Sequence, residues 1–340
     1  MIDTIHITLY SKIKPKQEFF KNLKNDLKTD ASTGEVIANW KGTWNNFKIY
    51  YYDNNRLQMQ GSLAKYYFGG QNLYTLDRTL IKKAITKMSR EIGLPIHEGV
   101  VTRLDLGDNF FVPNPVNEYT TFFGSLAYFP KSVIKNGETI YLGNNTRKII
   151  FYDKIKEMNS KKVEYPKTFK GRGTSNSQIL RYEVRILKVK KCSDIKEILK
   201  KNDSPAFLVE LLYEKEFYNS LVDIWLDYFE RIPKINTIVA NTTKLNSVNS
   251  LREYLAYLGL LGLSYDFVLN AIEARRDGIT NKQYFDMKKE LNRIAQNSFV
   301  SEIDPRIKTL TDKIRLSASR QKNIDRWTKE LEMTYFISEV

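Results

Sequence analysis

Cysteine and histidine are scarce in this chain of 340 residues, which contains one cysteine and two histidines. Cys192 alone cannot build a disulfide framework or a thiolate metal cluster. His6 and His97 lie in separate segments, so no paired-histidine zinc motif is present, and no Ser-His-Asp relay is convincing. The chain also lacks a Gly-rich loop ending in Gly-Lys-Ser/Thr, which argues against ATP hydrolysis.

Long apolar runs are missing as well. The longest candidate, residues 254–269, is too short and too mixed in composition to span a membrane. The first residues lack the apolar segment of a signal peptide. Together with the low cysteine content, these absences predict a cytoplasmic protein with no membrane partner.

Positive charge is abundant and unevenly placed. The formal net charge is +15, and residues 193–340 contain 22 basic and 22 acidic residues, so the whole excess lies in residues 1–192. A concentrated basic field among many aromatic residues predicts a nucleic-acid surface. Ribosome-associated and membrane-surface proteins remain alternatives on charge alone.

The pattern of elements predicts two domains. Residues 1–192 read as strands, a helix at residues 77–92 ended by Gly93, a strand, a second helix from Pro115 to about Tyr128, a hairpin and a final strand. This order predicts an α+β class fold, an antiparallel-sheet domain with two related β/α halves, although no internal repeat is visible in the sequence. Residues 159–177 are predicted to form a basic mobile loop.

Residues 193–340 predict a mainly α-helical second domain. Residues of about 264–297 form either a helix-turn-helix or an ordinary helical hairpin. The basic stretch after Asp304 is either a second DNA contact or a solvated helix.

Two predicted strands share an Arg-x-acid pattern on their polar side. "VTRLDL" places Arg103 and Asp105 on one face, and "LRYEVRI" places Arg181, Glu183 and Arg185 on one face. A single such pair is usually a salt bridge. Two of them in one basic sheet also predict a site for a hard divalent cation, Mg²⁺ or Mn²⁺, with the arginines holding carboxylates or meeting phosphate.

A third strand, "RKIIFYDKIKE" at residues 147–157, presents a tyrosine between lysines. Lys148, Tyr152 and Lys154 alternate onto one face of the predicted strand. This is either a half-exposed strand of a basic protein or a nucleophile aimed at a phosphate. Lys154 would favour the phenolate or bind phosphate, or is only solvated surface.

The order of several segments resembles a known family. "MIDTIHITLY", "LQMQGSLAKYYFGGQNLYTLDRTLIKKA", "TRLDLGDNF", "RKIIFYDKIKE" and "LRYEVRI" occur in the order seen in the gene II/X replication initiators of filamentous phages. "LYEKEFYNSLVDIWLDYF" and "YDFVLNAIEARRDGITNKQYF" are also similar to that family. The strands further resemble plasmid rolling-circle initiators of the replication-initiator–relaxase type.

The resemblance implies roles for individual residues. Tyr152 matches the nicking tyrosine, and Asp153 after it departs from the phage pattern. Tyr182 replaces the phenylalanine of the family's Arg-Phe-Glu-x-Arg strand. Glu157 is either a third metal ligand or a surface acid. Together with the strand pattern around Tyr152, the resemblance predicts a site with Tyr152 and Lys154 as catalytic residues, Asp105, Glu183 and Glu157 as metal ligands, and Arg103, Arg181, Arg185 and Lys148 as DNA contacts.

The implied function is initiation of rolling-circle replication in a bacterial host. Such an enzyme nicks one strand of a single-stranded, extruded or supercoiled origin, forms a 5′-phosphotyrosine and a free 3′-OH, and later rejoins the strand. A host helicase and polymerase are expected partners, and a homodimer is open. A conjugative relaxase of related fold and a non-catalytic origin-binding protein are the alternatives.

Overall fold

The computed structural model describes most of the chain. The described residues are 1–29, 36–52, 54–126, 129–134, 137–161, 178–234, 237–238, 247–263, 265–296, 301–302 and 304–323. The predicted loop at residues 159–177 therefore lies almost entirely outside the described residues.

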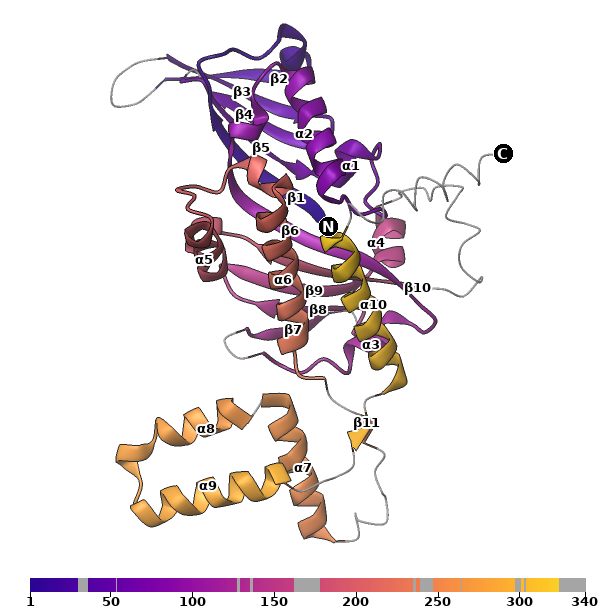
Figure 1. The fold of residues 1–340 in the computed structure, drawn as a ribbon, viewed down its shortest axis with the longest axis vertical. Coiled ribbons are helices and arrows are strands. Elements are labelled where there is room, and N and C mark those ends of the chain that lie inside the picture. Colours follow the sequence, from indigo (N-terminus) through magenta and orange to yellow (C-terminus); the bar gives the residue numbers. More distant parts are fainter. Residues whose placement is uncertain are drawn as a thin grey trace.

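Ten strands form one antiparallel sheet (Figure 1). They are β1 Ile2–Tyr10, β2 Leu23–Thr29, β3 Val36–Trp44, β4 Phe47–Tyr52, β5 Arg56–Ser62, β6 Val100–Val112, β7 Lys131–Ile134, β8 Thr139–Gly143, β9 Arg147–Asp153 and β10 Gln178–Ile186. The helices are α1 Leu63–Tyr67, α2 Arg78–Ile92, α3 Val116–Thr120, α4 Lys154–Ser160, α5 Ser193–Lys201, α6 Lys215–Arg231, α7 Val248–Leu263, α8 Tyr265–Glu273, α9 Asn281–Gln296 and α10 Pro305–Lys322. A separate strand pair joins β11 Thr237–Ile238 to β12 Ser301–Glu302.

The sheet consists of two units with the same topology. Its order is β2-β3-β4-β5-β1-β6-β10-β9-β8-β7, so the first strand of each unit, β1 or β6, pairs with the fifth, β5 or β10. At the junction Ile5 pairs with Leu104, and the two residues hold equivalent positions in the two units. An approximate two-fold axis normal to the sheet therefore passes between β1 and β6. The predicted α+β fold with two related halves is confirmed.

One face of the sheet is covered by helices because its strands alternate apolar and polar residues. Phe151 and Tyr182 stack with ring centroids 4.7 Å apart, and Trp225 of α6 lies 4.9 Å from Tyr182. In Figure 1, α2, α6 and α10 lie over this face. The opposite face of the sheet carries the polar side chains of the same strands.

Local signals explain where some helices begin and end. The Asp77 carboxylate accepts a hydrogen bond from the backbone N–H of Leu80 at the start of α2, and Gly93 ends that helix with φ 81°. The helix predicted from Pro115 to about Tyr128 was wrong in length, because α3 spans only Val116–Thr120. There the hydroxyl of Thr120 bonds to the carbonyl of Gly137, and the chain turns away.

The helices after residue 192 do not all form a separate body. Buried residues of α5, α6 and α10 belong to the same apolar core as the sheet. The predicted domain boundary at residues 192 and 193 therefore does not coincide with a change in packing. The helices α7, α8 and α9 have a small cluster of their own around Ile272, Tyr284 and Leu291, and Figure 1 shows them beyond the end of α6.

The predicted helical pair at about 264–297 is present as α8 and α9. The two helices are in contact, and Figure 1 shows them running side by side in opposite directions. Among the described residues, no helix is both long and apolar enough to cross a membrane.

Candidate active site around Tyr152

Tyr152 stands at the end of β9 on the polar face of the sheet. Phe151, its neighbour in the chain, is buried on the helical face, so strand alternation directs Tyr152 the other way. The strand ends at Asp153, whose carboxylate accepts a hydrogen bond from the backbone N–H of Lys156 at 2.9 Å and caps α4. The prediction that Lys154 continues the strand was therefore wrong, because Lys154 is the first residue of a helix.

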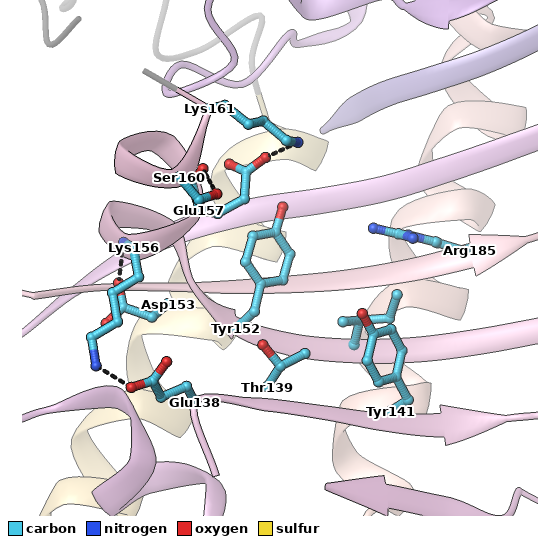
Figure 2. A pocket seen from close by; sticks show the side chains of 11 residues that line it. Glu138, Thr139, Tyr141, Tyr152, Asp153, Lys156, Glu157, Ser160, Lys161 and Arg185 are labelled. Carbon is cyan, nitrogen blue, oxygen red and sulfur yellow. Dashed lines mark hydrogen bonds and ion pairs between the residues drawn. The ribbon is translucent and has the colours of Figure 1, made fainter. Parts of the chain in front are cut away.

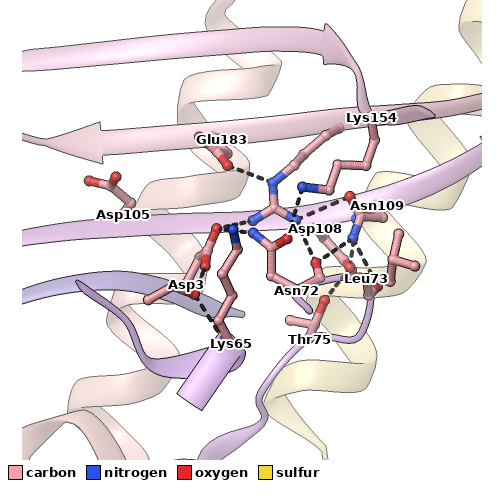
Figure 3. A network of polar contacts seen from close by, with 12 residues as sticks. Asp3, Lys65, Asn72, Leu73, Thr75, Asp105, Asp108, Asn109, Lys154 and Glu183 are labelled. Carbon is pink, nitrogen blue, oxygen red and sulfur yellow. Dashed lines mark hydrogen bonds and ion pairs between the residues drawn. The ribbon is translucent and has the colours of Figure 1, made fainter. Parts of the chain in front are cut away.

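Arg181 of β10 is buried and lies opposite Tyr152 of β9. It is the centre of a polar network, and Figure 3 shows its partners Asp3, Asn109 and Glu183. Its Nε donates to Glu183 Oε1 at 2.5 Å, and its Nη2 donates to Asp3 Oδ2 at 2.6 Å. Its Nη1 donates to Asn109 Oδ1 at 3.1 Å. The side chain is only 2% exposed, so Arg181 orients the carboxylates around it and does not reach solvent.

Glu183 connects this network to the tyrosine. The Tyr152 hydroxyl donates to Glu183 Oε1 at 3.0 Å, and Arg185 donates to Glu183 Oε2 from Nε and Nη2 at 2.9 and 2.8 Å. Burial opposes ionisation of Glu183, but the charges of Arg181 and Arg185 outweigh it and lower its pKa to about 2. Burial, followed by the charge of Glu183, raises the pKa of Tyr152 well above its ordinary value.

Asp105 lies on β6, which pairs with β10, the strand that carries Arg181 and Arg185. Arg103 donates to its two oxygens at 2.9 and 2.7 Å, and Arg185 Nε lies 3.7 Å from Oδ2. Burial raises the pKa of Asp105 against the opposing effect of these arginines. The Arg-x-acid pattern thus forms salt bridges along each strand. The side chains of Arg103 and Arg185 remain 25% and 30% exposed, so they can also meet a ligand.

Two cavities meet at Tyr152. One, of about 290 Å³, is lined by Asp3, Asp105, Glu157, Glu183, Arg185 and Tyr152 among others. The second, of about 250 Å³, lies on the side of Tyr141 and Lys156. Figure 2 shows the Tyr152 hydroxyl projecting between Glu157 and Arg185. Five of the residues singled out from the sequence therefore surround one cavity.

Lys154 and Glu157 form an ion pair at the base of α4. Lys154 Nζ donates to Glu157 Oε2 at 2.7 Å and to Asn72 Oδ1 at 2.8 Å, and the Lys154 side chain is 1% exposed. Its Nζ lies 5.9 Å from the ring centre of Tyr152. Burial, with the charge of Arg181, lowers the pKa of Lys154. Lys154 is therefore not solvated surface.

The carboxylates fit a hard divalent cation in donor chemistry, because oxygen ligands are what Mg²⁺ and Mn²⁺ prefer. In the structure, however, Asp105 and Glu183 are bonded to arginines, and Glu157 is bonded to Lys154 and Lys161. Within the described ranges, no three His, Cys, Asp or Glu side chains are arranged as a metal-holding group.

The sequence did not point to two residues of the network. Asp3 accepts from Arg181 and from Asn72 Nδ2 at 2.8 Å, and Asn72 also holds Lys154. Asp3 sits in the alternating pattern of β1, where a lone acid in a basic sheet was an available signal. Asn72 lies in the loop between α1 and α2 and gives no such signal. Lys148, predicted to contact DNA, lies opposite Arg185 on the neighbouring strand.

Comparison with known protein families bears on these observations. Residues 1–204 match the family described as the N-terminal region of the replication-associated gene II protein. The chain belongs to this filamentous-phage gene II replication initiator family. The match covers all ten sheet strands and every candidate site residue. No curated protein matches the chain. It is a replication-associated initiator protein, and membership of this family implies binding to origin DNA.

Proposed function

We propose that this initiator nicks one strand of origin DNA with Tyr152 as the nucleophile. The observation that supports this best is the position of the Tyr152 hydroxyl, which projects into a cavity beside Arg185 and is hydrogen-bonded to Glu183 at 3.0 Å. A nucleophile, a proton acceptor and a phosphate-binding cation thus meet at one place. The replication family favours this reading over conjugative transfer.

The partly exposed arginines are the groups that would receive the scissile phosphate. Arg185 and Arg103 each hold a carboxylate and keep part of the guanidinium open, and guanidinium groups bind phosphate with two parallel hydrogen bonds. When Arg185 turns to the phosphate, Glu183 loses one of the two cations that keep its pKa low. DNA binding would therefore make Glu183 a better acceptor for the proton of Tyr152.

The chemistry is then a balanced phosphoryl transfer. The Tyr152 oxygen attacks the phosphorus in line, the bond from phosphorus to the 3′ oxygen breaks, and the proton passes by way of Glu183 to the leaving 3′ oxygen. The products are a 5′-phosphotyrosine and a free 3′-OH. The number of phosphodiester-type bonds is unchanged, so the reverse step rejoins the strand without ATP. Lys154 lies close enough to the ring for its charge to favour the phenolate.

We also propose Mg²⁺ or Mn²⁺ as the cofactor, with Asp105, Glu183 and Glu157 as its ligands. Bound there, the cation would act as a Lewis acid on the phosphate oxygens. The exchange of Arg103 and Arg185 from carboxylate to phosphate would free oxygens of Asp105 and Glu183, and Glu157 would exchange Lys154 or Lys161 for the cation. Asp105→Asn and Glu183→Gln should then each raise the Mn²⁺ concentration needed for half-maximal nicking, by about ten-fold or more. If both variants respond to Mn²⁺ as the wild type does, the carboxylates are only salt-bridge partners.

The decisive experiment replaces the nucleophile. Tyr152→Phe keeps the ring and removes the oxygen, so nicking of a supercoiled plasmid carrying the replicon's own origin should fall by at least a thousand-fold. DNA affinity should stay within a few-fold. The readouts are open circles on a gel and a covalent protein–DNA adduct mapped by mass spectrometry.

Tyr141→Phe is the matched control, because Tyr141 lines the cavity on the other side of Tyr152. It should nick at a rate within a few-fold of wild type. Full nicking by Tyr152→Phe would overturn the assignment and point to Tyr141, since the Tyr182 hydroxyl is buried and donates to the carbonyl of Trp225. No adduct from the wild type with either metal would favour a non-catalytic origin-binding protein.

A further inference from the structure

The two units of the sheet carry matching residues at matching positions. The fourth strands, β4 and β9, are each followed by the strand that pairs with the first strand of the unit. Three residue types recur in them at the same places: Lys48, Ile49 and Tyr52 in β4, and Lys148, Ile149 and Tyr152 in β9. Tyr52 is therefore the counterpart of the proposed nucleophile.

The pairing of the strands supports this equivalence. Tyr52 lies opposite Arg56 of β5, just as Tyr152 lies opposite Arg181 of β10. The Arg56 guanidinium carbon lies 4.0 Å from the centre of the Tyr52 ring. Each unit thus places an arginine beside a tyrosine on the polar face of the sheet.

The hydroxyl groups of the two tyrosines make equivalent hydrogen bonds. Tyr52 is bonded to Gln58 Oε1 at 3.2 Å, and Tyr152 is bonded to Glu183 Oε1 at 3.0 Å. Gln58 and Glu183 each lie two residues beyond the arginine in the fifth strand. The similarity therefore extends from topology to individual contacts.

The positions of the first unit that correspond to Glu183 and Asp105 carry no acidic residue. Gln58 stands where Glu183 stands, and strand register places His6 of β1 where Asp105 stands in β6. Neither replacement carries a negative charge, and burial together with Arg103 lowers the pKa of His6 to about 4. The first unit thus keeps the tyrosine and the arginine and loses the carboxylates needed for a cation or for accepting a proton.

Two polar atoms beside Tyr52 point to a ligand. Asn39 and Arg56 lie opposite Tyr52 on its two neighbouring strands. Asn39 Oδ1 and Arg56 Nε are buried, and neither has a hydrogen-bond partner among the described residues. Buried polar atoms are normally hydrogen-bonded, so a donor and an acceptor are both open here. The bases and phosphates of a nucleic acid supply both kinds of group.

We propose that Tyr52, Arg56, Gln58 and Asn39 form a second DNA site that binds a single-stranded nucleotide without cutting it. The aromatic ring stacks on a base, and the arginine and the amides bind its polar edge and phosphate. The inference rests on the proposed function, because it takes this face of the sheet to be the surface that meets DNA. Five strand spacings separate β4 from β9, which is roughly 24 Å.

The two-fold axis sets the direction of the bound strand. Sites related by an axis normal to the sheet bind chains of opposite polarity. The second site therefore takes single-stranded DNA running antiparallel to the strand at Tyr152, as the two strands of an opened duplex do. A straight strand runs in one direction past both sites, so it has the required polarity at only one of them unless it folds back.

The test uses the full chain and two fluorescent DNA probes at one salt concentration. One probe is a linear oligo(dT) of 30 nucleotides, and the other is a short duplex whose two oligo(dT) tails of 15 nucleotides diverge as a fork. The wild type should bind the fork at least ten-fold more tightly, because the second tail binds as a tethered ligand. Tyr52→Ala and Arg56→Ala should each weaken fork binding by about five- to a hundred-fold, the range expected for loss of one stacked base.

Tyr52→Phe is the matched control for Tyr52→Ala, since it keeps the stacking ring and removes only the hydroxyl. It should bind the fork within a few-fold of wild type, and thermal unfolding confirms that each variant folds. Unchanged fork binding by a folded Tyr52→Ala protein overturns the second site. Equal wild-type affinity for fork and linear DNA overturns the antiparallel arrangement.

Covalent catalysis is measured separately, as the amount of protein–DNA adduct formed at a saturating DNA concentration. Tyr52→Ala should keep the Tyr152 adduct, whereas an adduct mapped to Tyr52 in the wild type would overturn the claim that this site does not cut. A wild type that forms no adduct refutes the nicking function, and its fork binding still decides the second site.

Discussion

At the scale of single residues, Glu183 links the stability of the fold to the chemistry of its site. Its pKa of about 2 lies below the ordinary value of 4.5, so its contribution to folding is complete above about pH 4.5 and is lost as pH falls toward 2. The free energy of unfolding should fall by about 3 kcal/mol over this range on account of this residue. Asp105 shifts in the opposite direction and cannot cause the loss.

Urea unfolding of the free protein between pH 7 and pH 2.5 measures this effect. Glu183→Gln should lower stability at pH 7, because Arg181 and Arg185 each lose one anionic partner, and should show a shallower acid dependence. An identical acid dependence in both proteins would mean that Glu183 is not held ionised by the arginines.

The alternation of polar and apolar residues made most of the site predictable. It placed Asp105, Glu183 and Tyr152 on one face of one sheet, and the resemblance to the initiator family supplied their expected roles. It left open whether the arginines hold the carboxylates or meet phosphate, because ion pairing depends on side-chain rotamers across three strands. Asn72 was also beyond prediction, since it reaches Arg181 and Lys154 from the loop between α1 and α2.

At the scale of elements, the short helix α4 holds Lys154 and Glu157 over the tyrosine. Asp153→Ala removes the carboxylate that caps this helix and should cost about 1 kcal/mol of stability. Asp153→Asn keeps a capping oxygen and should stay close to wild type. Thermal unfolding measures the stability, and nicking should fall with Asp153→Ala more than with Asp153→Asn. Equal nicking by the two variants would show that α4 does not position the site.

Element boundaries were the least predictable part of the fold. The bounds of α2 were predictable, because its helical spacing of apolar residues lies between the capping residue Asp77 and Gly93. The strand around Tyr152 read as continuing through Lys154, since alternation persists there and a capping aspartate looks like any other polar residue. The edge strands β2 and β7 were missed, because β2 has few apolar residues and β7 has only four residues.

At the scale of the whole molecule, the helices α7 to α9 are an excursion from the sheet. The strand pair β11–β12 brings its two ends together, with Ile238 opposite Ser301. Residues 239–300 contain 8 basic and 6 acidic residues, so most of the positive charge lies elsewhere. Replacing them with an Asn-Gly turn should leave a folded protein whose salt dependence of DNA binding is largely kept, while preference for origin over scrambled duplex is lost.

A fragment of residues 1–192 should behave differently, because it lacks α6 and α10. Without them the face carrying Phe151 and Tyr182 is exposed to water, so this fragment should aggregate or stay unfolded. Circular dichroism measures whether this fragment and the variant without residues 239–300 fold, and DNA titration at several salt concentrations compares their binding.

If the variant without residues 239–300 keeps its full preference for origin DNA, the sheet, and not α7–α9, recognises the origin sequence.

The position of α10 also sets the moment during synthesis at which the centre of the sheet is covered. Ser317 Oγ bonds to Asp108 Oδ2 at 2.5 Å and Lys313 Nζ bonds to the Phe111 carbonyl at 2.6 Å, so α10 closes over β6 in the middle of the sheet. The ribosome makes β6 long before it makes α10, so β6 lacks the packing of α10 until that helix has been synthesised. A nascent or truncated chain that lacks α10 would therefore lack a rigid Tyr152 cavity, and the proposed nicking activity would appear only after α10 has been made.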